Sequence, residues 1–147
     1  MKWLFRTRSG IGGLILRLGL AAAMFPHGAQ KALGIWGGKP LKETAEMLRT
    51  GINQSWFSTE LAYCVIAAEF LGAIGVALGF LTRLAALSIL SVMGGAVYFV
   101  HWKNGFFAAA GGFEYPMALG AMALAVVFLG AGRLSVDGAL SKDRLPA

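Results

Sequence analysis

The sequence predicts an all-α integral membrane protein, a four-helix bundle in which residues 1–147 form a single transmembrane domain. The composition is 57% hydrophobic and only 14% charged, whereas about a quarter of the residues in a typical soluble domain carry a charge. Four apolar segments approach or exceed the ~20 residues that a helix needs to cross a bilayer. These segments are residues 11–32, 59–80, 84–101 and 115–134.

The first apolar segment follows Lys2, Arg6 and Arg8, and in this respect it is similar to a secretory signal peptide. However, Arg17 lies in the middle of the segment and three further apolar segments follow it. Both features argue against cleavage, so the segment is predicted to be the first membrane-spanning helix.

The three connections between the segments differ in length. The first, residues 33–58, contains 26 residues, and within it residues 40–48 begin with a proline and predict a short interfacial helix closed by Gly51. The second is a tight turn around Arg83, which makes the flanking helices an antiparallel hairpin. The third, residues 101–114, is predicted to lie on the same side of the membrane as the first.

Four spans place both termini on one side of the membrane. That side carries seven Lys and Arg residues and the opposite, outer side carries five, so the positive-inside rule predicts cytoplasmic termini. The seven are Lys2, Arg6, Arg8, Arg83, Arg133, Lys142 and Arg144, and the five are Lys31, Lys39, Lys42, Arg49 and Lys103.

Composition also excludes some functions. The net charge of +6 comes without a basic run that contains interleaved aromatic residues, so we expect no nucleic-acid partner. Cys64 is the only cysteine, which excludes dithiol redox chemistry within one chain. Glycines in the second segment predict close helix packing, and Gly75 with Gly79 also fits self-association into a homo-oligomer.

Two opposite charges lie inside the apolar segments. Arg17 is ten residues before His27, and Glu69 is ten residues after Thr59. At ~1.5 Å per residue, each charge lies about 15 Å below the outer end of its helix. Because an isolated charge at this depth is unfavourable, we predict a buried ion pair between Arg17 and Glu69. This pair either fixes only the helix register, or includes a Glu69 that also contacts a ligand.

Polar side chains gather at the outer ends of the predicted helices. His27, Gln30 and Lys31 are spaced i, i+3 and i+4, so they share one helical face. Aromatic residues concentrate on the same side, and an interfacial aromatic belt accounts for several of them. The sequence therefore predicts one outer polar or ligand-binding pocket, formed by His27, Gln30, Lys31, Glu69, His101, Trp102, Asn104, Glu114 and Tyr115.

A series of short motifs closely resembles the DoxX family of small four-helix bacterial membrane proteins. The motifs are HGAQK at 27–31, EFLGAIGVALGFLTRLAAL at 69–87, HWKNGFF at 101–107, GGFEYP at 111–116 and GAGRLSVD at 130–137. The resemblance implies a multi-pass protein of the bacterial plasma (inner) membrane that acts with partner proteins in a complex. It also implies a link to redox processes, because relatives belong to a thiosulfate to quinone oxidoreductase and to oxidative-stress defence complexes.

The residue types of the predicted pocket suit a quinone, which needs an apolar slot, hydrogen-bond donors and a carboxylate. The sequence contains no cysteine cluster, no flavin or nicotinamide motif and no c-type haem attachment motif. We therefore expect no intrinsic cofactor, no metal site and at most a non-autonomous subunit of a membrane oxidoreductase. His27 and His101 are the candidate axial ligands of a haem b, although histidines at helix ends more often hydrogen-bond their neighbours.

The alternative hypothesis is a non-catalytic accessory subunit, or a protein that binds a small molecule or lipid. An ion or proton channel is less favoured, because no polar stripe continues to the cytoplasmic side.

Overall fold

The computed structural model describes residues 10–141, and all regular secondary structure in this range is helical, as predicted. The elements in chain order are α2 (Ile11–Leu33), α3 (Leu41–Ile52), α4 (Thr59–Leu78), α5 (Thr82–Gly95), the π-helical η1 (Ala96–His101), the 3-10 helices η2 (Trp102–Asn104) and η3 (Ala108–Ala110), α6 (Glu114–Leu129) and α7 (Val136–Leu140).

Within residues 10–141, three helices are long and apolar enough to cross a membrane, namely α2, α4 and the continuous helical stretch Thr82–Asn104. This length and composition make the chain a multi-pass membrane protein. The predicted fourth span, residues 115–134, is shorter than expected: α6 is apolar but has 16 residues and ends at Leu129. It ends there because Gly130, with φ 75°, leaves the helical conformation.

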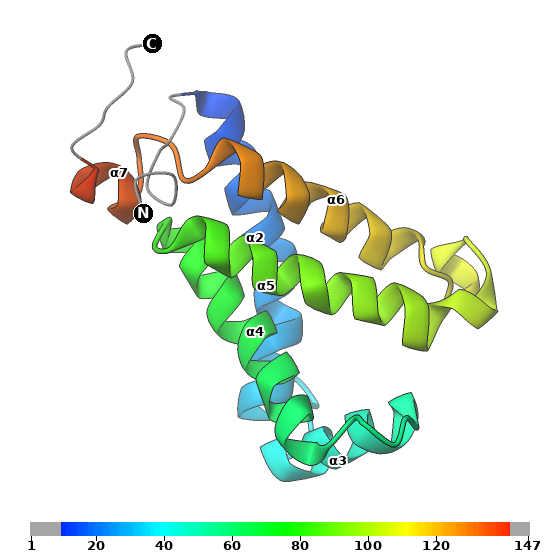
Figure 1. Ribbon diagram of the computed structural model, residues 1–147. Helices are drawn as coiled ribbons and strands as arrows, with labels where there is room; N and C mark the ends of the chain where they lie inside the picture. The colour runs from blue at the N-terminus through cyan, green and yellow to red at the C-terminus, as the bar shows by residue number, and fades with distance from the viewer. Residues whose placement is uncertain (1–9, 142–147) are drawn as a thin grey trace.

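The four helices of the bundle, α2, α4, α5 and α6, form two antiparallel pairs. α2 packs mainly against α4 and α5 mainly against α6, while α4 with α5 and α2 with α6 connect the pairs. Figure 1 shows the pairs close together near α7 and spread apart toward the opposite end, where α3 and η1 to η3 lie. We call these the α7 end and the α3 end of the bundle.

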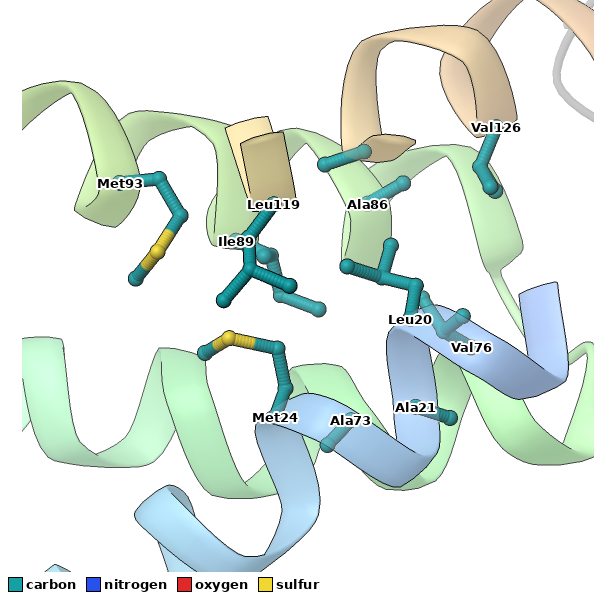
Figure 2. Packing of buried hydrophobic residues seen from close by; sticks show 11 residues of the cluster. Leu20, Ala21, Met24, Ala73, Val76, Ala86, Ile89, Met93, Leu119 and Val126 are labelled. Carbon is teal, nitrogen blue, oxygen red and sulfur yellow. The ribbon is translucent and has the colours of Figure 1, made fainter. Parts of the chain in front are cut away.

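One hydrophobic core holds all four helices together. Figure 2 shows its side chains meeting between the helices, from Val126 and Val76 near the α7 end to Met24 and Met93 toward the α3 end. Every helix contributes small residues as well as large ones, so the backbones approach closely. The buried members are Leu20, Ala21, Met24, Ala73, Val76, Ala86, Ile89, Met93, Leu119, Ala123 and Val126.

The connection between α2 and α4 contains the predicted short helix, with one difference. α3 begins after Pro40, as expected, but it continues through Gly51 and ends at Ile52. Its C-cap is Asn53, which adopts the left-handed conformation with φ 49°. Gly51 was therefore wrongly predicted as the helix stop. Ala45 of α3 is buried in a second, smaller core that also contains Phe57 and Ile66.

The predicted ion pair between Arg17 and Glu69 is wrong. Nη1 of Arg17 donates to the carbonyl oxygen of Ala131 at 2.9 Å, and Nη2 donates to that of Leu134 at 2.7 Å. The carboxylate of Glu69 instead pairs with Lys31. Both buried charges thus have partners, but different ones from those predicted.

The error came from the residue used as the reference for depth. The prediction measured the depth of Arg17 from residue 27, although the predicted segment runs to residue 32 and α2 continues to Leu33. In the structure, Gly28 rather than Arg17 lies opposite Glu69. Arg17 packs against Gly79, ten residues further along α4. At ~1.5 Å per residue, the two charges are separated by about 15 Å along the bundle.

A buried carboxylate joins the C-terminal segment to the turn between α4 and α5. Asp137, only 1% exposed, accepts hydrogen bonds from the backbone N–H of Leu81 (2.9 Å) and of Thr82 (2.9 Å), and from Thr82 Oγ1 (2.8 Å). These donors form the N-terminus of α5, where a negative charge is favourable. Arg17 and Arg83 lie within electrostatic range of the same carboxylate. We call Arg17, Thr82, Arg83 and Asp137 the Asp137 cluster.

Candidate functional site

A cavity of about 370 Å³ lies between the two helix pairs at the α3 end. Its floor is the part of the hydrophobic core nearest the α3 end, formed by Met24, Met93 and Leu119. Polar side chains from α2, α4, η1 and α6 line its walls, and residues 108–112 cover part of it. The lining residues are Met24, His27, Lys31, Glu69, Met93, Ala96, His101, Ala108, Gly111, Gly112, Tyr115, Pro116 and Leu119.

The central polar feature of this cavity is an ion pair between Lys31 and Glu69. Nζ of Lys31 contacts both carboxylate oxygens, at 2.7 and 2.6 Å. The Glu69 side chain is 4% exposed and the Lys31 side chain is 29% exposed. Since the two charges neutralise one another, the pair adds hydrogen-bonding capacity to the cavity without adding net charge.

Gly28 explains why these two side chains meet. A Cβ atom at Gly28 would lie 2.6 Å from Cα of Phe70, so only glycine allows α2 and α4 to approach this closely. Lys31 lies about one turn further along α2, where its side chain reaches the carboxylate of Glu69. The close helix contact therefore positions the ion pair.

His101 is held at the end of a π-helical segment. η1 follows α5 without a break, and such wide turns within α-helices are frequent at functional sites. Nδ1 of His101 lies 2.7 Å from the carbonyl oxygen of Gly111. Because a carbonyl can only accept a hydrogen bond, Nδ1 carries the proton in this contact. This bond attaches the covering loop, residues 105–113, to the wall of the cavity.

The covering loop is closed by further hydrogen bonds. The N–H of Phe113 donates to the carbonyl of Gly105 at 3.0 Å. Asn104 Nδ2 donates to the carbonyl of Gly111 at 3.1 Å, and the N–H of Ala108 donates to Glu114 Oε2 at 3.0 Å. The backbone bond thus joins the two ends of the loop, and the side chains of Asn104 and Glu114, outside the cavity, hold Gly111 and Ala108 within it.

Five of the nine side chains predicted for the outer pocket line this cavity, namely His27, Lys31, Glu69, His101 and Tyr115. The rings of His27 and Tyr115 have centroids 6.0 Å apart. Since these five residues come from α2, α4, η1 and α6, the structure brings together residues up to 88 positions apart in the sequence.

The other four predicted residues do not line the cavity. Asn104 and Glu114 bind the covering loop, as described above. Trp102 is 60% exposed and stacks on Phe113 with ring centroids 5.2 Å apart. Gln30 donates to the carbonyl of Trp36 at 3.2 Å and borders a separate surface pocket beside α3.

The prediction missed the apolar part of the site. Met24 and Met93 lie in uninterrupted apolar segments, where nothing in the sequence distinguishes them from other core residues. Pro116 and Leu119 are spaced i and i+3, so they share one face of α6. This spacing was the one signal in the sequence that could have placed them together in the site. Only the packing of the four helices shows that these side chains end at a cavity.

A second, wholly different hollow runs along the outside of α4 and α5. It has a volume of about 590 Å³ and an almost entirely apolar lining that includes Cys64, Ala67, Leu71, Gly75 and Leu84. A Cβ atom at Gly75 would lie 2.9 Å from Cβ of Ala85, so the glycine serves the packing of α4 against α5. We call this hollow the α4–α5 groove.

The cavity is suited to bind a neutral molecule with an apolar body and a polar head. Its floor offers aliphatic and thioether groups, while its walls offer an imidazole, a phenol and a neutralised ion pair. Among residues 10–141, no three His, Cys, Asp or Glu side chains gather as a metal site would require.

Comparison with known proteins identifies the relatives of this chain. It is 27% identical over 140 residues to a protein of Haemophilus influenzae described as uncharacterized, and the match covers 91% of this chain and 86% of the relative. No solved structure matches the chain. The model of the DoxX family matches residues 12–102, which include all but the first residue of α2, all of α4, α5 and η1, and four of the five polar cavity residues. The chain is therefore a member of the DoxX family.

Proposed function

We propose that this protein binds a small neutral redox molecule of the quinone class in the cavity at the α3 end, and that it serves as a non-autonomous component of a membrane oxidoreductase. The observation that carries the proposal is the composition of the cavity. An apolar floor faces His27, His101, Tyr115 and the ion-paired Glu69, which are the side chains that can hold a carbonyl- or hydroxyl-bearing ring.

The charge of the cavity narrows the ligand class. Lys31 is already bound to both oxygens of Glu69, so it offers no free positive charge to an anion. An inorganic sulfur oxyanion would have to break this pair, whereas a neutral ring would not. The same geometry therefore favours a quinone over a sulfur anion as the molecule that enters the cavity.

We further propose that the α7 end faces the cytoplasm of a bacterial cell and that the cavity opens toward the outer face. The distribution of Lys and Arg residues supports this orientation. Electrons would reach or leave the ligand through partner proteins, because the sequence contains no motif for a bound flavin, iron–sulfur cluster or nicotinamide.

A second candidate function is supported by the α4–α5 groove. A long apolar hollow on the outside of the bundle suits a lipid chain or a transmembrane helix of a partner. In this reading the protein is an accessory subunit whose cavity has no redox ligand.

One experiment separates the two functions. The protein is purified from membranes in a mild detergent, and co-purifying molecules are identified by mass spectrometry. Two matched variants are compared with the wild type: Ala96→Phe fills the cavity, and Ala67→Phe fills the groove. We expect a bound quinone that is lost in Ala96→Phe and retained in Ala67→Phe.

Two outcomes would contradict the proposal. Recovery of phospholipid alone, lost in Ala67→Phe, would support the accessory function. An intense Soret band from the purified protein would replace the quinone with a haem, for which His27 and His101 are the histidines available in the chain.

A further inference from the structure

The tautomer of His101 determines which kind of ligand head the cavity can hold. Nδ1 donates its proton to the carbonyl of Gly111 at 2.7 Å. In a neutral imidazole one nitrogen is a donor and the other an acceptor, so Nε2 then carries a lone pair. Within residues 10–141, Nε2 makes no hydrogen bond of its own, and the ring lines the cavity. The Nε2 edge is therefore the part of the ring available to a ligand.

Two other acceptors at the cavity are already engaged, the Glu69 carboxylate and the Gly111 carbonyl. Both carboxylate oxygens of Glu69 are bound by Nζ of Lys31. The carbonyl of Gly111, a residue that also lines the cavity, receives hydrogen bonds from both His101 and Asn104. His101 Nε2, by contrast, is an acceptor with no partner among residues 10–141, so a ligand can bond to it without breaking an existing bond.

We propose that the cavity recognises a ligand head that donates a hydrogen bond, a phenolic hydroxyl, to Nε2 of His101. For the quinone class this means that the hydroquinone form binds more tightly than the quinone form, whose carbonyl oxygens can only accept. The inference rests on the proposed function, because it assumes that an aromatic ring of this class enters the cavity.

The size of the preference follows from the cost of an unpaired polar atom. A carbonyl placed against Nε2 would bring two acceptors together and leave both without a partner. A loss of this kind corresponds to about a tenfold weaker binding.

The test uses the purified full-length protein in mild detergent, with binding measured by isothermal titration calorimetry under argon. The three probes are tetramethylhydroquinone, tetramethylbenzoquinone and the dimethyl ether of the hydroquinone, which keeps the ring but lacks the donor. For the wild type we expect the hydroquinone to bind about tenfold more tightly than either of the other two.

Three variants assign the preference to one nitrogen. In His101→Asn the amide NH₂ replaces Nδ1–H and keeps the bond to Gly111, but the shorter side chain leaves no acceptor at the position of Nε2, so the preference should fall to about twofold or less. In His101→Gln the amide oxygen can take the place of Nε2, so the preference should be largely restored. Asn104→Ala loosens the same loop from outside the cavity and should keep the preference.

Different results would overturn different steps. If the quinone binds as tightly as the hydroquinone, or if His101→Asn keeps the full preference, the inference is wrong while the proposed function stands. If none of the three probes binds to the wild type, both the inference and the proposed function are wrong. Thermal unfolding of each variant shows whether its fold is intact.

Discussion

The ion pair between Lys31 and Glu69 predicts that removing one partner destabilises the protein more than removing the other. The Glu69 side chain is 4% exposed, whereas that of Lys31 is 29% exposed and also borders the surface pocket beside α3. Lys31→Met therefore leaves an almost fully buried carboxylate without its counter-ion. By contrast, Glu69→Gln leaves an ammonium group on a long side chain that can turn toward the surface pocket. The loss of Lys31 should be the more damaging change.

The expected magnitudes follow from this difference in burial. Removing one partner of a buried pair costs about 3–5 kcal/mol, because the other charge stays buried. We assign about 3 kcal/mol to Lys31→Met on this basis, and about 1 kcal/mol to Glu69→Gln, since Lys31 is partly exposed. The double variant removes both charges and should recover to within about 1 kcal/mol of the wild type.

The assay is thermal unfolding in one detergent, followed by the fluorescence of the four tryptophans. For a chain of this size, about 3 kcal/mol corresponds to a Tm decrease of roughly 6–12 °C. Lys39→Met is the matched control, because Lys39 and Glu43 form a half-exposed pair that should contribute little. The reasoning is refuted if Glu69→Gln lowers Tm as much as Lys31→Met, or if the effects in the double variant simply add.

Two further predictions concern the packing of the bundle. Asp137→Asn should lower Tm by roughly 6 °C or more. The change removes the negative charge that faces Arg17 and Arg83, and it supplies an NH₂ group where the N-terminus of α5 needs an acceptor. Glu60→Gln, which changes an exposed acid on α4, is the control, and an equal Tm decrease in the two variants would contradict the proposed role of the Asp137 cluster. Gly28→Ala should disturb the contact between α2 and α4 and reduce the yield of folded protein, since its Cβ would lie 2.6 Å from Cα of Phe70. Gly94→Ala, where a Cβ meets nothing within 4 Å, should be tolerated, and size-exclusion profiles of the two variants check the difference.

Much of the site follows from local sequence patterns. The i, i+3 and i+4 spacing of His27, Gln30 and Lys31 predicts a shared helical face, and His27 and Lys31 do line the cavity. His101 and Tyr115 were predicted from their positions at the ends of apolar segments. These predictions succeeded because they depend on helix geometry and on the cost of placing polar groups in an apolar segment, both of which are local.

The failures have a common physical cause. Pairing Arg17 with Glu69 required the relative shift of α2 and α4 along the bundle axis, and that shift is set by the close contact at Gly28. Trp102, Asn104 and Glu114 were placed in the pocket by membrane depth alone, and Gln30 by depth together with its helical face. Side chains at one depth can point into the bundle, toward the loop or toward the surface, and depth does not distinguish these directions.

The sequence by itself therefore determined the helical class, the apolar segments and the residue types at the α3 end, because hydrophobicity and helix periodicity are properties of short stretches of chain. Only the tertiary structure decided which charges pair, where α6 and α3 end, and which apolar residues form the floor of the cavity. These features depend on how closely two helix backbones approach and in what register. The distance and register of two packed helices result from many weak contacts between residues distant in sequence, so they cannot be read from any single segment.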